Sequence, residues 1–277
     1  MKNFSRLDAA AVLKRFDLRA DKSLGQNFLQ DESALEAIVA AAEIQKTDFV
    51  LEIGAGLGSL TRYLAVAARE VVAVELDGRL LQPLQAILAP HGNVRIVHGD
   101  ILKLAPDELI AEQEYIVVAN IPYYITSAVI RHLLESKAKP RRIVLTIQRE
   151  VAERICAEPG DLSLLALSVQ VYGEPRIAAR IPAEAFFPNP NVASAVLCVD
   201  IFPSPRVGQD LIGLFFKLTK AGFSQKRKML RNSLSAGLHI SPAQAEELLL
   251  RAGIAPRRRA ETLSIEEWQS LIEKYEK

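Results

Sequence analysis

Short apolar runs alternate with amphipathic stretches over the part of the chain from Thr47 to about Gln148. The runs have the length of buried strands, and the stretches between them repeat their apolar positions with the period of a helix. Strands separated by helices predict right-handed crossovers and a parallel α/β sheet with helices on both faces. The expected strands are residues 49–54, 70–76, 94–100, 115–120 and 142–148, and the expected helices are residues 58–68, 78–89 and 127–136.

The pattern changes after the fifth expected strand. Two further apolar runs, residues 164–173 and 194–201, are expected to add a hairpin to one edge of the sheet. The sequence FPSPRVG at residues 202–208 contains two prolines and a glycine, which is typical of a linker. We therefore expect two domains, residues 1–203 and residues 204–277.

The second domain is predicted to be entirely helical. Ser241 and Gln244 form the capping-box pattern of a helix start, and Ser264 and Glu267 repeat this pattern before the last amphipathic stretch. Lys and Arg outnumber Asp and Glu by 13 to 8 in residues 204–277, whereas they are outnumbered by 25 to 21 in the rest of the chain. A basic helical domain beside a mildly acidic one suggests contact with a polyanion, although a solvated basic surface gives the same pattern.

The composition is that of an ordinary globular protein. The 277 residues are 49% hydrophobic and 24% charged, which suffices for a large core. No apolar run approaches the ~18 residues of a membrane span, and the charged N-terminus is unlike a signal peptide. Cys156, Cys198 and the four histidines show no metal-binding spacing, so we expect no metal. We expect a cytoplasmic monomer, since two unpaired thiols fit a reducing compartment.

Three glycines, Gly54, Gly56 and Gly58, follow the first expected strand and precede a helix. Glycines at this place allow a sharp turn and the close approach of a ligand to the backbone. Glu75 lies 21 residues after Gly54 at the end of the next strand, where its carboxylate would accept hydrogen bonds from two ribose hydroxyls. The pattern therefore indicates a ligand that contains a nucleoside.

Two such ligands compete for this turn. A dinucleotide site prefers glycine where this chain has Ser59. S-adenosylmethionine has a ribose but no phosphate, and it suits a G-x-G-x-G turn preceded by an acid, here Glu52. Asp100, after the next strand, is placed to accept from an adenine amino group. We expect S-adenosylmethionine; taken singly, the same residues fit a tight turn, a surface glutamate and a capping aspartate.

The sequence VVANIPYYITS, residues 117–127, places polar and aromatic groups at the tip of the fourth strand. An exocyclic nucleobase amine has two N–H donors, and its lone pair is conjugated with the ring. The side-chain oxygen of Asn120 would accept one N–H, and the carbonyl of Ile121 or Pro122 the other, which directs the lone pair toward the methyl donor. Tyr123 offers a stacking face for an unstacked base. A helix start with two core tyrosines is the alternative.

These motifs resemble those of the small-subunit ribosomal RNA adenine dimethyltransferase family, and the resemblance covers nearly the whole chain. Its N-terminal box, donor turn and adenine motif resemble KSLGQNFLQD, LEIGAGLG and NIPYYITS, and its later blocks resemble QREVAERICAEPG, AFFPNPNVASAV and RRRAETLSIEEW. The resemblance implies a Rossmann-like class I methyltransferase domain and a small helical domain. It also implies transfer of two methyl groups to each of two adjacent adenosines in a 3′-terminal hairpin of 16S rRNA, in the small ribosomal subunit or its precursor, with S-adenosylhomocysteine as product.

The resemblance also implies a set of site residues. The donor is expected on Asn27, Leu29, Gly54, Gly56, Glu75, Asp100 and Asn120. The target base is expected on Asn120, Pro122 and Tyr123, with Phe187 sandwiching it against Tyr123 and Phe186 in the core. RNA is expected on Lys226, Arg227, Lys228, Arg231, Arg257, Arg258 and Arg259.

Three positions depart from the family pattern and bear on base and RNA contacts. Tyr124 stands where asparagine is usual, and Asn191 and Ala193 stand where lysine and aspartate are usual. Two other functions stay open. A resistance enzyme that modifies large-subunit RNA would share the donor and adenine motifs, although the ending RRRAETLSIEEWQSL resembles the small-subunit family better. A ribosome-assembly factor would act mainly by binding immature small subunits.

Overall fold

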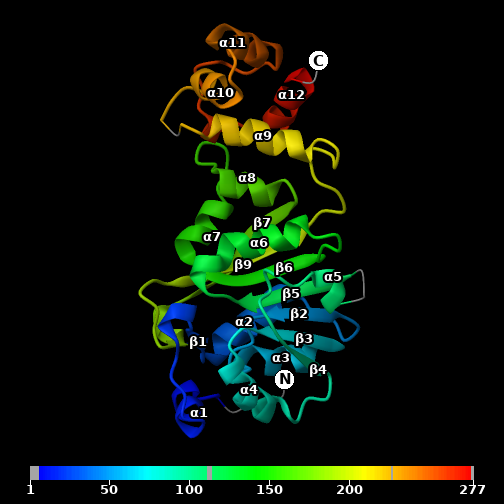
Figure 1. The fold of residues 1–277 in the computed structure, drawn as a ribbon, viewed down its shortest axis with the longest axis vertical. Helices are drawn as coiled ribbons and strands as arrows, with labels where there is room; N and C mark the ends of the chain where they lie inside the picture. Colours follow the sequence, from blue (N-terminus) through cyan, green and yellow to red (C-terminus); the bar gives the residue numbers. More distant parts are fainter. Residues whose placement is uncertain (1–5, 111–113, 226, 276–277) are drawn as a thin grey trace. The chain divides into compact units, whose positions relative to one another are not determined.

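The chain folds into two compact units, and a computed structural model describes its residues 6–110, 114–225 and 227–275 (Figure 1). The first unit comprises Met1–Ala152 and Pro175–Ile201, and the second comprises Glu153–Glu174 and Phe202–Lys277. The second unit thus resumes next to the boundary expected after residue 203, but it also takes in an earlier segment that the sequence placed in the first domain.

Seven strands form the sheet of the first unit in the order β4-β3-β2-β5-β6-β9-β7. The five strands expected from the sequence pair in parallel, and β9 runs antiparallel to β6. The order of the parallel strands reverses between β2 and β5, and the carboxyl ends of such strands flank a ligand crevice in open α/β sheets. The strands are β2 (Phe49–Ile53), β3 (Glu70–Glu75), β4 (Val94–His98), β5 (Tyr115–Asn120), β6 (Arg142–Gln148), β7 (Gly173–Ile181) and β9 (Ser194–Ile201).

The edge of the sheet corrects one prediction. Residues 164–173 were expected to form a strand, but α8 occupies Leu164–Gln170, and the neighbouring edge strand β7 begins only at Gly173. Ser163 caps this helix, because its side chain accepts a hydrogen bond from the backbone N–H of Ala166. The helix belongs to the second unit and packs against α9, and Tyr172 beyond it lies 6.4 Å, ring to ring, from Phe216.

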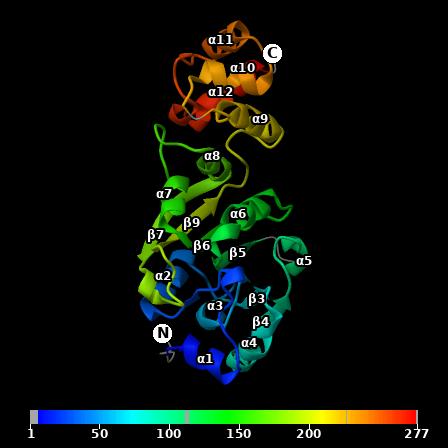
Figure 2. The ribbon, with the colours of Figure 1, turned by 60° about the vertical axis from the view of Figure 1, so that its left-hand side comes forward.

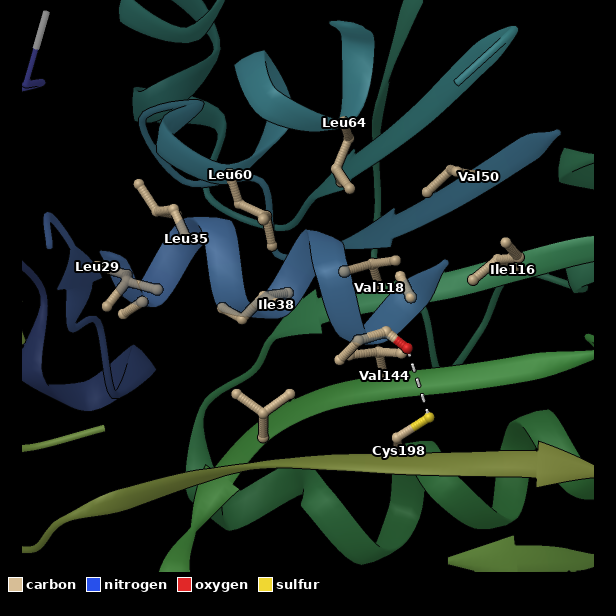
Figure 3. Packing of buried hydrophobic residues seen from close by; sticks show 14 of the residues in the cluster. Leu29, Leu35, Ile38, Val50, Leu60, Leu64, Ile116, Val118, Val144 and Cys198 are labelled. Atoms are coloured by element: carbon tan, nitrogen blue, oxygen red, sulfur yellow. Dashed lines mark hydrogen bonds between the residues drawn. The ribbon is translucent and has the colours of Figure 1, made fainter. Parts of the chain in front are cut away.

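Helices and a short ribbon complete the first unit. Figure 3 shows Leu35 and Ile38 of α2 packed over Val118 and Val144 of the sheet. These side chains are almost fully buried, and α2 covers the face of the sheet over β5, β6 and β9. The elements are α1 (Ala9–Arg15), α2 (Glu32–Ala42), α3 (Ser59–Ala67), α4 (Leu81–Leu88), α5 (Pro106–Leu109), α6 (Thr126–Glu135), α7 (Arg149–Ile155), on which the division between the units falls, and the paired strands β1 (Phe28–Leu29) and β8 (Phe186–Phe187).

The second unit is helical, as predicted, and its last four helices pack together (Figure 2). Trp268 is fully buried and stacks on Phe223, with ring centroids 6.2 Å apart. Both predicted caps form: Ser241 with Gln244, and Ser264 with Glu267. These helices are α9 (Ile212–Gly222), α10 (Leu230–Leu238), α11 (Pro242–Arg251) and α12 (Ile265–Tyr275). In the part of the chain that the structure describes, no helix is long and apolar enough to span a membrane.

Candidate active site

A cavity opens at the carboxyl ends of β2, β3 and β5, where the sequence placed the donor. All seven residues expected to hold the donor line this cavity, and so do Pro122 and Tyr123 from the expected base site. They come together because the parallel strands end at the same edge of the sheet. The expected donor residues are Asn27, Leu29, Gly54, Gly56, Glu75, Asp100 and Asn120.

The glycine turn after β2 has the conformation that its sequence requires. Gly54, Gly56 and Gly58 have φ values of 76°, 58° and 82°, in the left-handed region that glycine tolerates best. A Cβ at Gly56 would lie only 3.2 Å from the ring of Phe28, so the N-terminal segment packs directly on the turn. The backbone N–H of Gly56 donates to Oε2 of Glu75 at 2.7 Å. The turn and the acid at the end of β3 therefore support each other.

Glu75 is held in place by the backbone on both sides. Its Oε1 accepts a second hydrogen bond, from the backbone N–H of Asp77 at 2.8 Å. Burial nevertheless raises the pKa of the Glu75 carboxyl above its ordinary value. The remaining lone pairs of a fixed, buried carboxylate are well placed to accept from paired hydroxyls of a ligand in the cavity.

Glu52 is a second buried acid beside Glu75. Its side chain is 1% exposed, lines the cavity, and has no hydrogen-bond partner for Oε2 among the described residues. Burial, together with the negative charge of Glu75, raises the pKa of Glu52 to about 8. A buried acceptor without a partner is costly unless a ligand satisfies it. The acceptor, the nearby acid and the glycine turn together fit a cationic nucleoside such as S-adenosylmethionine.

The side of the cavity formed by Asp100 contains apolar residues that sequence reasoning missed. Asp100 lines the cavity, and its Oδ1 accepts a hydrogen bond from the backbone N–H of Leu102 at 3.1 Å, so it also caps its own turn. Leu76 and Ile101 directly follow the two acids of the strand ends and line the same cavity. Leu76 is 47% exposed, so its side chain is accessible to a ligand in the cavity. In the sequence, each of the two acids is followed directly by an apolar residue, and this pattern could have predicted that the two apolar side chains bind a flat ring between them.

The N-terminal segment that covers the site, residues 21–27, is tied to the turn after β3. Arg79 pairs with Asp77 at 2.7 Å and with Asp21 at 2.8 Å. The side chain of Gln26 donates to Asp77 at 2.8 Å and accepts from the backbone N–H of Asp21 at 2.8 Å. The hydrogen bond from Arg79 is the main cause that lowers the pKa of Asp77. These four side chains hold the segment beside Glu75.

Asn120, the last residue of β5, is oriented by the same segment. Its side-chain nitrogen donates to the backbone oxygen of Asn27 at 3.1 Å, which leaves its oxygen directed as an acceptor. The carbonyl of Pro122 accepts from the backbone N–H of Ile125 at 3.2 Å, in the 3₁₀ turn Tyr123–Ile125. Of the two carbonyls considered from the sequence, that of Ile121 is therefore the better second acceptor.

Tyr123 is positioned by a residue that the sequence did not single out. Its hydroxyl forms a hydrogen bond of 2.8 Å with Oγ of Ser194, a fully buried side chain at the start of β9. Burial raises the pKa of the Tyr123 hydroxyl, so it remains a neutral phenol near neutral pH. The hydrogen bond fixes the ring at the mouth of the cavity without using the ring face.

Of the two phenylalanines of β8, Phe186 is buried in the core of the first unit, as the sequence predicts. Phe186 lines the cavity, whereas Phe187 is not among the lining residues and packs on the apolar cluster around Leu13 of α1. Strand pairing sets Phe187 opposite Phe28 and Phe186 opposite Leu29. Both residues of β1, Phe28 and Leu29, line the cavity, whereas Phe186 is the only one of the two β8 residues that does.

The positions that depart from the family pattern differ in their surroundings. Tyr124 is exposed and lines the cavity. The backbone oxygen of Ala193 accepts from the backbone N–H of Arg149 at 3.0 Å, and Asn191 is exposed. Among the residues that the structure describes, no group of three or more potential metal ligands is present.

The expected RNA-binding residues divide into two groups. Arg227, Lys228, Arg257 and Arg259 are exposed, and their two segments meet where Leu230 donates its backbone N–H to the backbone oxygen of Arg258 at 2.7 Å. The guanidinium of Arg258 is engaged inside the unit, by Glu267 and by the carbonyl of Thr262 at 2.6 Å. Arg231 pairs with Glu246 at 2.8 Å. Lys226 lies outside the described residues.

Comparison with known proteins supports one reading of this site. A family model described as ribosomal RNA adenine dimethylase matches residues 17–277. A ribosomal RNA small subunit methyltransferase A from Dehalococcoides mccartyi is 46% identical over 264 residues, covering 95% of this chain and 91% of that protein. The protein of the same name from Geobacillus kaustophilus is 43% identical over 270 residues, covering 94% and 92%.

Solved structures share the fold. The structure of the 23S rRNA methyltransferase ErmE has a TM-score of 0.74 and 28% identity, covering 91% of this chain and 100% of that chain. A dimethyladenosine transferase from Plasmodium falciparum has a TM-score of 0.78 at 23% identity, covering 90% and 97%. The chain therefore belongs to the ribosomal RNA adenine dimethylase family and is an S-adenosylmethionine-dependent methyltransferase that dimethylates adenine in ribosomal RNA.

Proposed function

We propose that this enzyme methylates the exocyclic amines of two adjacent adenosines in a 3′-terminal hairpin of 16S rRNA. The products would be N6,N6-dimethyladenosines, formed in the small ribosomal subunit or its precursor during maturation. The observation that carries the chemistry is the acceptor pair at the end of β5, the Asn120 side-chain oxygen and the Ile121 carbonyl, beside the donor cavity. The choice of the small subunit is supported by relatives of that name at 46% and 43% identity along the chain.

The donor would be held at the ends of β2 and β3. S-adenosylmethionine, when bound, supplies a methyl group on a positively charged sulfur. Glu75 would accept from the ribose hydroxyls, Asp100 from the adenine amine, and Leu76 with Ile101 would cover the faces of the adenine ring. Glu52 and the glycine turn would face the polar end of the ligand. Asn27 and Leu29 would close over it from the N-terminal side.

The target amine would be prepared by hydrogen bonding rather than by a strong base. Two acceptors that lie out of the plane of the base pull the N–H bonds from that plane, so the nitrogen becomes tetrahedral and its lone pair is localised. Asn120 can serve in this way because Asn27 holds its amide in one orientation. After each transfer the nitrogen is cationic and loses a proton readily to water. The second transfer then proceeds with one remaining N–H.

The base itself would be held by aromatic faces. Tyr123, fixed by Ser194, is the proposed platform for the unstacked adenine, and Phe186 lines the cavity near it. Base–aromatic stacking contributes about 1–3 kcal/mol for each base. The exposed basic residues Arg227 and Arg257 and their neighbours would bind phosphates of the RNA, whereas Arg258 would act within the helical unit. We further propose that the enzyme acts as a monomer in the cytoplasm.

One experiment separates this function from its alternatives. The enzyme and a donor with a labelled methyl group are incubated with one RNA substrate in each reaction. The substrates are small subunits, their precursors, naked 16S rRNA, large subunits and 23S rRNA. Label is expected in the small-subunit particles or their RNA, and an Asn120→Ala variant should transfer little. Label confined to large-subunit RNA would favour a resistance methyltransferase, for which the similarity to ErmE gives some support. Tight binding to immature small subunits without transfer would favour an assembly factor.

A further inference from the structure

Tyr124 is an aromatic residue that the proposed reaction leaves without a role. Its side chain is 64% exposed although it lines the cavity. Among the described residues only five large apolar or aromatic side chains are exposed, and Leu76 of the donor site is another of them. A single exposed apolar residue is ordinary on a protein surface, but this ring also lines the cavity in which the target base is proposed to bind. The question is therefore which ligand the exposed ring of Tyr124 would contact.

The position of the Tyr124 ring is fixed by the N-terminal segment. Gly25 has a φ of 63°, and a Cβ on it would lie 3.3 Å from Cε1 of Tyr124 and 3.1 Å from Cβ of Pro122. Gly25 therefore lies directly next to the ring of Tyr124. Consecutive residues of a 3₁₀ turn point about 120° apart, so Tyr123 turns toward Ser194 while Tyr124 stays at the rim. The two rings are preorganised on different sides of one turn.

The chemistry of the substrate decides what the second ring would meet. When an adenine leaves its stack to enter the cavity, the neighbouring base loses the partner on which it was stacked. A single phosphodiester links the nucleotide that carries that base to the target, so the base must lie near the mouth of the cavity. A fixed tyrosine face beside the mouth offers stacking without regard to sequence, because every base has a π-face.

We propose that Tyr124 is a second nucleobase-binding site, which stacks the nucleotide adjacent to the adenosine whose amine is being methylated. The proposal rests on the proposed function, in which two adjacent adenosines are modified in turn. With one base on Tyr123 and its neighbour on Tyr124, the enzyme exchanges the two by a shift of one nucleotide. Tyr124 would thus favour RNA in which the target has a stackable neighbour.

The test combines variants of the protein with variants of the RNA. Small subunits are reconstituted with 16S rRNA whose 3′ segment is synthetic and carries an abasic nucleotide on the 5′ or the 3′ side of a target adenosine. Methyl transfer to that adenosine is measured as kcat/KM for wild type, Tyr124→Ala and Tyr124→Phe, and donor affinity is measured by calorimetry. Leu250→Ala is the matched control, because Leu250 on α11 is 61% exposed and lies outside the cavity.

The expected result is a non-additive loss. In the wild type, one of the two abasic substitutions should lower kcat/KM roughly 5- to 150-fold, which corresponds to about 1–3 kcal/mol of stacking. On intact RNA, Tyr124→Ala should lower kcat/KM by a similar factor. The abasic nucleotide should then change the kcat/KM of Tyr124→Ala very little. Tyr124→Phe and Leu250→Ala should behave as wild type, and donor affinity should be equal in all four proteins.

Other outcomes overturn the proposal. Full activity of Tyr124→Ala, or an abasic effect of equal size in both proteins, would show that the ring does not hold the neighbouring base. Weaker donor binding by Tyr124→Ala would make the residue part of the donor site instead. If the wild type leaves intact small subunits unmethylated, the proposed function fails first, and this proposal fails with it.

Discussion

Replacing Glu52 by glutamine tests the electrostatics of the donor site. The residue is fully buried at the end of β2, with Glu75 nearby and Oε2 unpartnered among the described residues. Its pKa rises from an ordinary value of 4.5 to about 8. Glutamine has nearly the same shape and no charge, so Glu52→Gln removes the titration while it keeps the packing. Wild type and variant share every other titratable group, including Glu75.

The sign of the stability effect follows from proton linkage. Between pH 4.5 and about 8 the folded protein keeps the Glu52 proton that the unfolded chain has lost, so the free energy of unfolding falls as pH rises. The slope is about 1.4 kcal/mol for each pH unit when one proton is involved. Above about pH 8 both states are ionised and the slope ends. Glu52→Gln should lack this slope and should gain on wild type as the pH increases.

Two assays check the prediction. Thermal unfolding of the donor-free proteins from pH 5 to 9 should show Tm curves that diverge by roughly 2–4 °C for each kcal/mol. Calorimetric titration with S-adenosylmethionine should show that wild type binds more tightly as pH rises toward 8, because a cation favours the ionised carboxylate and expels its proton. Glu52→Gln should not share this dependence. Parallel Tm curves and parallel affinity curves for the two proteins would refute a buried, neutral Glu52 that faces the donor.

Three further tests, which use five substitutions, probe single contacts. Tyr123→Phe loses the hydrogen bond to Ser194, worth about 0.5–1.5 kcal/mol, and should keep methylation within roughly tenfold of wild type, whereas Tyr123→Ala should lose about 5- to 150-fold; equal inactivity of both variants in a transfer assay would give the hydroxyl a chemical part. Arg258→Ala should lower the free energy of unfolding in urea by about 1–2 kcal/mol. Arg257→Ala should leave stability unchanged and flatten the log–log salt slope of RNA binding by ~0.7–0.9. A stability loss in Arg257→Ala and a flatter salt slope in Arg258→Ala would contradict these roles. Arg79→Gln should weaken donor binding a few-fold at low salt, measured by calorimetry, and high salt should reduce its difference from wild type. Equal donor affinity of the two proteins would show that Arg79 does not hold the N-terminal segment over the site.

The sequence predicted the sheet and most of the donor site because both depend on local patterns. The polar residues Glu75 and Asn120 mark the ends of their strands in the sequence itself. The topology of a parallel sheet then brings these strand ends to one edge. The capping boxes at Ser241 and Ser264 are equally local, and both form as predicted. Residues 164–170 show the limit of this reasoning, since a short apolar run has the same composition in a buried helix and in a strand.

The parts that were missed depend on contacts between distant residues. Phe187 and Phe186 of β8 pair with Phe28 and Leu29 of β1, about 158 positions away along the chain. The pair Arg79–Asp21 spans 58 positions, and the hydrogen bond between Tyr123 and Ser194 spans 71. Arg258 looks like its basic neighbours in the sequence, and only the fold shows that Glu267 occupies its guanidinium. No spacing rule reveals such partners.

The most direct measurement follows the two methyl groups on the target amine. Small subunits that lack the modification are incubated with S-adenosylmethionine and the enzyme, and the digested RNA is analysed over time for mono- and dimethyladenosine and for their positions. Wild type should produce dimethyladenosine at two adjacent adenosines near the 3′ end of 16S rRNA. Asn120→Ala should depress both transfers while RNA binding persists. Dimethyladenosine formed by Asn120→Ala at the wild-type rate, or methylation by wild type at atoms other than the adenine amine, would contradict the acceptor role assigned to Asn120.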